Sequence, residues 1–153
     1  MARNFLGFLT MQTRIVVIGG PSTGKTTYCA GFMGASFVRC TDPKSLGGDV
    51  DDHLELPVKE RWSAASADVL HWFDAPGPWV IEGCGVARAL RKWKLQHPGL
   101  PCPCDEVHLL LLPKVELTPA QASMGKGVLT VLDEILPWLK ETALVVSIAT
   151  IKS

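Results

Sequence analysis

Short apolar runs alternate along the chain with stretches whose apolar residues recur at helical spacing. The runs at residues 14–18, 36–40, 79–83, 106–112 and 143–149 are rich in β-branched and apolar residues and predict strands. Residues 26–33, 58–73, 86–96 and 127–139 predict helices, and residues 114–123 predict a loop or lid. Strands that alternate with helices indicate an α/β fold, in which helices cover both faces of a five-stranded parallel sheet.

The length of 153 residues predicts one domain. Residues 14–153 carry the alternating pattern, and residues 1–13 precede it as an N-terminal extension. In parallel sheets of this type, ligands bind at the carboxyl ends of the strands. We therefore look for functional residues in the loops that follow Ile18, Cys40, Gly83 and Leu112.

Composition narrows the classes of function. Hydrophobic residues make up 47% of the chain and the formal net charge is zero, which predicts a folded protein and argues against one that coats nucleic acid. No apolar run approaches the roughly 20 residues that span a bilayer. Five cysteines without framework spacing indicate a reducing, cytoplasmic environment. The pair in "LPCPCDE", Cys102 and Cys104, has metal-ligand spacing but no matching second pair, which favours two ordinary thiols in a loop.

The loop after the first strand fits the pattern G-x-x-x-x-G-K-[ST] in full. Glycines let successive backbone N–H groups turn toward a phosphate, and the following helix adds the positive end of its dipole. Lys25 would reach the β and γ phosphates, and the Thr26 hydroxyl would ligate Mg²⁺. The predicted nucleotide-binding residues are Gly19, Gly20, Pro21, Ser22, Thr23, Gly24, Lys25, Thr26 and Thr27.

This loop is a Walker A motif, and the chain resembles the P-loop kinases. The order of features is most similar to that of small nucleotide kinases and of the kinase domain of polynucleotide kinases, small forms of which are frequent in bacteriophages. The resemblance implies a three-layer P-loop kinase fold over residues 14–153 and the use of ATP and Mg²⁺. It also implies transfer of the γ-phosphoryl group to a hydroxyl or phosphate on a nucleotide or nucleic acid.

Several acceptors stay open under this resemblance. One is a nucleoside monophosphate, and another is hydroxymethyluracil within phage DNA, which would place the protein in the host cytoplasm. An alternative of another class is a P-loop ATPase or a nucleotide-gated binding module. The run "VHLLLLP" lacks the terminal acid that such proteins usually carry, which favours the kinase.

Two carboxylates follow predicted strands. Asp42 matches the aspartate that engages the acceptor hydroxyl in polynucleotide-kinase-like enzymes, where it would act as general base. The alternative is a turn-forming aspartate before Pro43. Glu82 resembles the acidic-Gly pair of nucleotide kinases, although aspartate is usual there. We expect Glu82 to contact Mg²⁺ or the acceptor, because an unpaired buried carboxylate is costly.

Two groups of cations complete the candidates. Arg88, Arg91 and Lys92 fall on one face at helical spacing, where Arg88 would grip the acceptor's phosphate and all three, with Trp93 nearby, would contact DNA. A solvated helix face is the alternative. Lys126 lies between two glycines in the position of a kinase lid, where it would neutralise phosphate charge as a catalytic residue. Its alternative is an ordinary lysine at a helix start.

Overall fold

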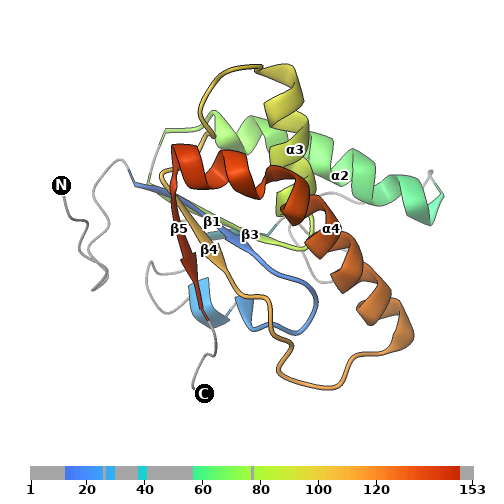
Figure 1. Ribbon diagram of the computed structural model, residues 1–153. Coiled ribbons are helices and arrows are strands. Elements are labelled where there is room, and N and C mark those ends of the chain that lie inside the picture. Colours follow the sequence, from blue (N-terminus) through green and yellow to red (C-terminus); the bar gives the residue numbers. More distant parts are fainter. Residues whose placement is uncertain (1–12, 26, 30–37, 41–56, 77, 149–153) are drawn as a thin grey trace.

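The computed structural model describes residues 13–25, 27–29, 38–40, 57–76 and 78–148 (Figure 1). Thr26, Asp42 and nearly all of the predicted N-terminal extension lie outside the described residues. The roles predicted for Thr26 and Asp42 therefore stay predictions.

The described strands form one parallel sheet in the order β2-β3-β1-β4-β5. The strands are β1 (Arg14–Ile18), β2 (Val38–Cys40), β3 (Trp79–Gly83), β4 (Glu106–Leu109) and β5 (Leu144–Ser147). The predicted α/β class with a parallel sheet is confirmed. The chain leaves β1 toward β2 at one edge, and it leaves β3 toward β4 on the opposite side of β1. Such a reversal opens a crevice between the carboxyl ends of two adjacent strands, here β1 and β3.

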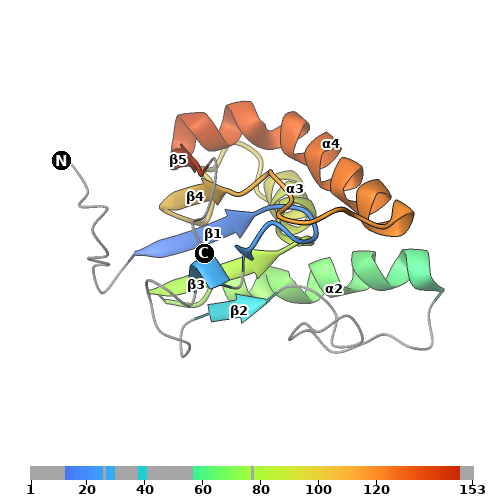
Figure 2. The same cartoon turned by 90° about the horizontal axis from the view of Figure 1, so that it is seen from below.

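Helices lie on both faces of this sheet (Figures 1 and 2). One face carries α2 (Val58–Phe73), α3 (Val86–Gln96) and α4 (Pro119–Thr142). The opposite face carries the short helical segment formed by residue 25 and residues 27–29. No helix among the described residues is both long enough and apolar enough to cross a membrane.

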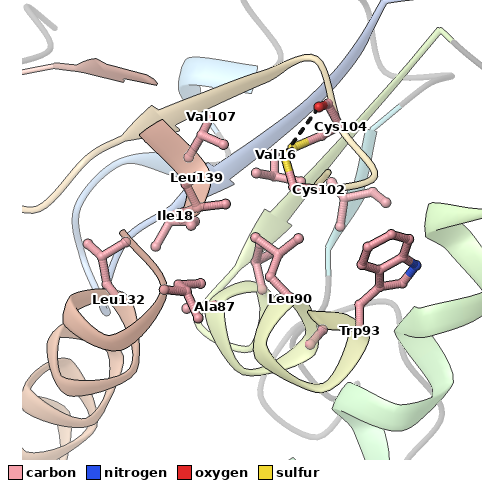
Figure 3. Packing of buried hydrophobic residues seen from close by; sticks show 14 of the residues in the cluster. Val16, Ile18, Ala87, Leu90, Trp93, Cys102, Cys104, Val107, Leu132 and Leu139 are labelled. Atoms are coloured by element: carbon pink, nitrogen blue, oxygen red, sulfur yellow. Dashed lines mark hydrogen bonds between the residues drawn. The ribbon is translucent and has the colours of Figure 1, made fainter. Parts of the chain in front are cut away.

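Alternation along β1 divides the core into two clusters. Val16 and Ile18 point toward the three long helices, whereas Ile15 and Val17 point toward the other face with Cys29. Figure 3 shows the larger cluster, in which Val16, Ile18 and Val107 of the sheet lie under Ala87 and Leu90 of α3 and Leu132 and Leu139 of α4. The four core residues of β1 from Ile15 to Ile18 are at most 1% exposed, so the strand that precedes the phosphate loop has a rigid base.

The last third of the chain departs from the predicted boundaries. β4 ends at Leu109 rather than at residue 112, because the chain turns toward the phosphate loop and the Lys114 N–H donates to the Ser22 carbonyl at 2.7 Å. The predicted loop or lid over 114–123 is wrong in its second half, because α4 already begins at Pro119. Thr118 caps that helix in a capping box with Gln121, and proline is favoured at the first helical position.

Candidate phosphate-binding site

The loop between β1 and the short helix is strained and tightly enclosed. Ser22 and Gly24 have φ angles of 60° and 85°, a left-handed conformation that turns the backbone sharply. A Cβ atom on Gly19 would lie 2.2 Å from the Leu110 carbonyl oxygen, so only glycine fits there. The Tyr28 N–H donates to the Gly24 carbonyl at 2.9 Å, which starts the helix at the end of the loop. The first turn of an α-helix has amides without intrahelical partners, which suits the binding of an anion.

Lys25 folds back over this loop. Its side chain is only 7% exposed, and Nζ donates to the Gly20 carbonyl oxygen at 2.7 Å. The Thr23 hydroxyl donates to the same oxygen at 3.1 Å. A buried ammonium beside a ring of backbone amides suits the oxygens of a polyphosphate. The geometry of the described part of the loop therefore fits the predicted nucleotide phosphates.

Glu82 is a buried carboxylate on the neighbouring strand. It is 1% exposed and pairs in register with Val17 of β1. Burial, and after it the charge of Glu82, raises the pKa of the Cys29 thiol, whereas the charge of Lys25 lowers it. Glu82 and Lys25 therefore act on the same small region of the core.

The residues near the loop fit Mg²⁺ only as a partly hydrated ion. Among the described residues no group of three or more His, Cys, Asp or Glu side chains could hold a metal. Mg²⁺ commonly uses one or two protein oxygens together with substrate phosphates and waters. A carboxylate such as Glu82 is the type of ligand that this ion prefers, and Thr26, the other predicted ligand, lies outside the described residues.

A cleft of about 350 Å³ opens beside the phosphate loop, between α2, α3 and α4. Its walls are mostly apolar, with Ala87 on α3 and Met124, Val128 and Val131 on α4. Arg88 of α3 supplies the positive charge in the lining. Cys84 links the cleft to the loop, because this residue lines the cleft and its Sγ lies 3.8 Å from Lys25 Nζ.

The basic residues of α3 have different partners. Arg88 lines the cleft, Arg91 forms an ion pair of 3.2 Å with Glu134 on α4, and the Lys92 ammonium donates to the carbonyl and hydroxyl of Ser63. Burial, with the charges of Arg88 and Arg91, lowers the pKa of Lys92. These effects place the three charges near one another, as the predicted common face requires, although Arg91 contacts α4 and Lys92 contacts α2. Their contact with DNA stays a prediction.

Trp93 does not offer a surface for stacking. It is 8% exposed, belongs to the core and stacks on His97 with ring centroids 4.0 Å apart. The helix spacing that places Trp93 near the basic residues is real, but its side chain faces inward. A base could not stack on it without a rearrangement of α3.

Lys126 lies within α4 and is exposed, so it is neither a hinge residue nor the first residue of a helix. The lysine that the structure ties to the phosphate loop is Lys114, through its backbone bond to Ser22. The sequence pattern favoured Lys126 as the lid cation. The difference depends on where α4 begins, which the capping box at Thr118 could have indicated.

A buried hydrogen-bonded chain supports the site from the other face of the sheet. The Tyr28 hydroxyl lies 2.6 Å from His108 Nδ1, and His108 Nε2 lies 3.1 Å from Glu106 Oε1. Glu106 and His108 are each 6% exposed. Tyr28 belongs to the helix that begins at the phosphate loop, so this chain fixes that helix to β4. The spacing of Glu106 and His108, two residues apart on a strand, could have revealed their common face.

Comparisons with known proteins find matches among solved structures. No protein-family model matches the sequence, and no curated protein matches it. Among solved structures, the chain is similar to shikimate kinase from Acinetobacter baumannii in complex with shikimate. The two share 18% sequence identity with a TM-score of 0.49, over 94% of this chain and 87% of that chain.

Proposed function

We propose that the protein is an ATP-dependent kinase that transfers the γ-phosphoryl group to a small acceptor bound in the cleft between α2, α3 and α4. The observation that carries this proposal is the position of Lys25. Its ammonium lies over the phosphate loop and, at 3.8 Å, beside the thiol of Cys84 in the wall of the cleft. A phosphate held by the loop and a molecule held in the cleft would therefore meet at one side chain.

The chemistry of phosphoryl transfer requires positioning and charge neutralisation. The loop amides and Lys25 would hold the β and γ phosphates, and Mg²⁺ held in part by Glu82 would neutralise charge on the phosphates. Arg88 would orient an acceptor that carries an anionic group, because a guanidinium binds carboxylate and phosphate oxygens in a fixed geometry. Asp42, outside the described residues, stays the proposed general base.

The walls of the cleft favour a kinase over an ATPase. Apolar side chains line it from α3 and α4, and they would exclude water around a bound acceptor. An ATPase needs only an ordered water and has no use for an apolar cleft next to the γ-phosphate. A nucleoside monophosphate would suit the size of the cleft. The sequence resemblance offers another acceptor, a nucleotide such as hydroxymethyluracil that is extruded from DNA. This nucleotide would have to enter the same cleft.

The test is transfer of label from γ-labelled ATP to a panel of acceptors. The panel contains nucleoside monophosphates, small hydroxy acids and sugars, DNA with 5′-hydroxyl ends and hydroxymethyluracil-containing DNA. We expect label on one small acceptor, and we expect Lys25→Ala to abolish transfer while circular dichroism shows an unchanged fold. Label on DNA alone would contradict the proposal of a small acceptor and would support DNA as the acceptor. Free phosphate released by the wild type, with no labelled acceptor, would support the ATPase.

A further inference from the structure

The sequence Cys102-Pro103-Cys104 brings two thiols together just before β4. Pro103 sits at a bend, and the two Sγ atoms lie 3.7 Å apart (Figure 3). Cys102 is 6% exposed and Cys104 is 3% exposed. The pair precedes β4, at the end of the sheet opposite the phosphate loop, so it takes no part in the proposed phosphoryl transfer.

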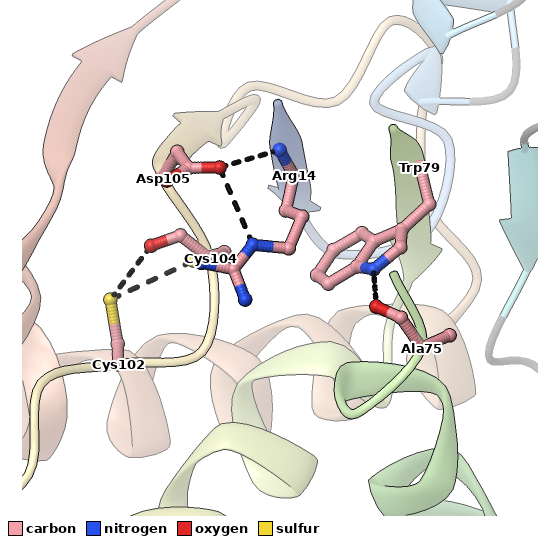
Figure 4. A network of polar contacts seen from close by, with 6 residues as sticks. All are labelled: Arg14, Ala75, Trp79, Cys102, Cys104 and Asp105. Atoms are coloured by element: carbon pink, nitrogen blue, oxygen red, sulfur yellow. Dashed lines mark hydrogen bonds and ion pairs between the residues drawn. The ribbon is translucent and has the colours of Figure 1, made fainter. Parts of the chain in front are cut away.

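Contacts on both sides hold this segment in place. The Cys102 N–H donates to the Thr142 hydroxyl at the end of α4, at 3.2 Å. The Asp105 carboxylate accepts from the backbone N–H of Arg14 at 2.7 Å and from its side-chain Nε at 3.4 Å (Figure 4). The segment is therefore fixed between α4 and the start of β1, and these contacts hold the two sulfurs next to each other.

On one side, the pair borders a hollow at the surface. A hollow of about 460 Å³ is lined by both cysteines, by Arg14 and by Glu141. The hollow lies at the surface beside α4, so the thiols are shielded by neighbouring side chains but are not sealed in the core. The Arg14 guanidinium in its lining is paired with Asp105, and Glu141 adds a second carboxylate.

The two thiols differ in reactivity. A hydrogen bond from the Cys104 thiol, together with one from Thr142, lowers the pKa of Cys102 to about 6, although burial opposes the shift. The same hydrogen bond and complete burial raise the pKa of Cys104. Because the thiolate is the nucleophile and Cys102 is also the more exposed of the two thiols, Cys102 would be the attacking sulfur and Cys104 the resolving one.

We propose that Cys102 and Cys104 form a redox-active dithiol, which a low-molecular-weight disulfide such as oxidised glutathione converts into an intramolecular disulfide. A closed zinc site does not account for the pair. Such sites use four protein ligands, and the described residues contain no group of three or more metal-binding side chains.

The reaction balances as two thiol–disulfide exchanges. The Cys102 thiolate attacks one sulfur of oxidised glutathione, forming a mixed disulfide and releasing one glutathione thiolate, which takes up a proton. Cys104 loses its proton to solvent and attacks Cys102 Sγ, which releases the second glutathione. The protein dithiol loses two electrons, and one oxidised glutathione becomes two reduced molecules. The sulfurs move from 3.7 Å to a bond of about 2.05 Å by side-chain rotation.

The experiment uses the full chain in buffers of defined ratios of reduced to oxidised glutathione. Samples are quenched in acid, their free thiols are alkylated in denaturant, and tryptic peptides are analysed by mass spectrometry. The peptide that spans residues 95–114 contains Cys102 and Cys104 and no other cysteine. We expect this peptide to lose two hydrogen atoms and both alkylation sites, while Cys29, which is buried with a raised pKa, stays alkylated.

Two variants separate the roles of the thiols. Cys104→Ser should accumulate a glutathione adduct on Cys102, because the resolving sulfur is absent. Cys102→Ser should slow modification of the peptide at least about tenfold, because the remaining thiol is buried and protonated. When both single variants are unfolded in urea, their remaining thiols should react at similar rates.

Three results would overturn the proposal. The first is a peptide whose two cysteines stay fully alkylated across the glutathione range. The second is an adduct that forms equally fast on either single variant in the folded state. The third is a disulfide that links Cys102 or Cys104 to another chain rather than to its neighbour.

Discussion

The ammonium of Lys25 lies 3.8 Å from the thiol of Cys84. The first residue belongs to the loop after β1 and the second to the turn after β3, 59 positions later in the chain. This contact is where the candidate phosphate site meets the candidate acceptor cleft. It exists because β1 and β3 are adjacent strands whose carboxyl ends share one edge of the sheet.

Arg88→Ala should weaken acceptor use more than nucleotide use. Loss of a charge-assisted hydrogen bond costs about 1.5–3 kcal/mol, which corresponds to a rise of roughly 10- to 100-fold in acceptor KM. The KM for ATP should change less than about twofold, because Arg88 lines the cleft and not the phosphate loop. Steady-state kinetics with the acceptor found in the panel would measure both. Arg91→Ala, which breaks only the surface pair with Glu134, is the matched control. Equal changes in acceptor KM in both variants would show that Arg88 does not bind the acceptor.

Gly19→Ala should disrupt the phosphate loop. The added Cβ would lie 2.2 Å from the Leu110 carbonyl oxygen and 2.7 Å from the Thr23 hydroxyl, so the backbone must shift. We expect a loss of about 1–3 kcal/mol in the free energy of unfolding and weaker binding of a fluorescent ATP analogue. The comparison is Gly127→Ala within α4, where an added Cβ meets nothing within 4 Å and should raise stability by about 0.5–1 kcal/mol. Urea unfolding of the two variants should therefore give opposite signs.

Tyr28→Phe should lower the free energy of unfolding, because it takes a hydrogen-bond partner away from a buried side chain. The substitution removes the hydroxyl that lies 2.6 Å from His108 Nδ1, a residue only 6% exposed. A buried polar group left without this partner costs about 1–3 kcal/mol in the free energy of unfolding. Thr130→Val removes an exposed hydroxyl that bonds the Lys126 carbonyl, and should cost no more than about 0.5 kcal/mol. If urea unfolding gave the same loss for both variants, the Tyr28–His108 contact would contribute nothing.

The alkylation rate of Cys102 should depend on pH as expected for an acidic thiol. Because its pKa is lowered to about 6, the thiolate fraction should be one half at about pH 6 and nearly complete about two pH units above that. An ordinary thiol reaches one half only at about pH 8.5, so its reactivity should keep rising well above about pH 8. Cys104→Ala removes the hydrogen bond that stabilises the thiolate, and the nearby negative charge of Asp105 remains, so the midpoint should move to higher pH. Native-state alkylation with iodoacetamide, followed by peptide analysis, would measure both midpoints.

Local patterns in the sequence predicted much of the architecture. The boundaries of β1, α2, β3 and α3 agree with those predicted from the sequence, because each combines a clear apolar period with glycine or proline punctuation at its ends. The start of α4 was missed, because Gly125 and Gly127 lower helix propensity and suggested a break. The capping box at Thr118 and packing of Val128, Val131 and Leu132 against the core outweigh that cost.

By itself, the sequence determined the parallel α/β class and the glycine-rich loop with Lys25, because strand period and turn chemistry are local properties of the chain. Only the tertiary structure decided which side chains meet. It paired Arg91 with Glu134, joined Tyr28 to His108, and placed the thiol of Cys84 beside Lys25. Contacts between residues distant in sequence depend on strand order and on the direction in which each helix packs. Those quantities are set by burial of the whole core and are not encoded in any single segment.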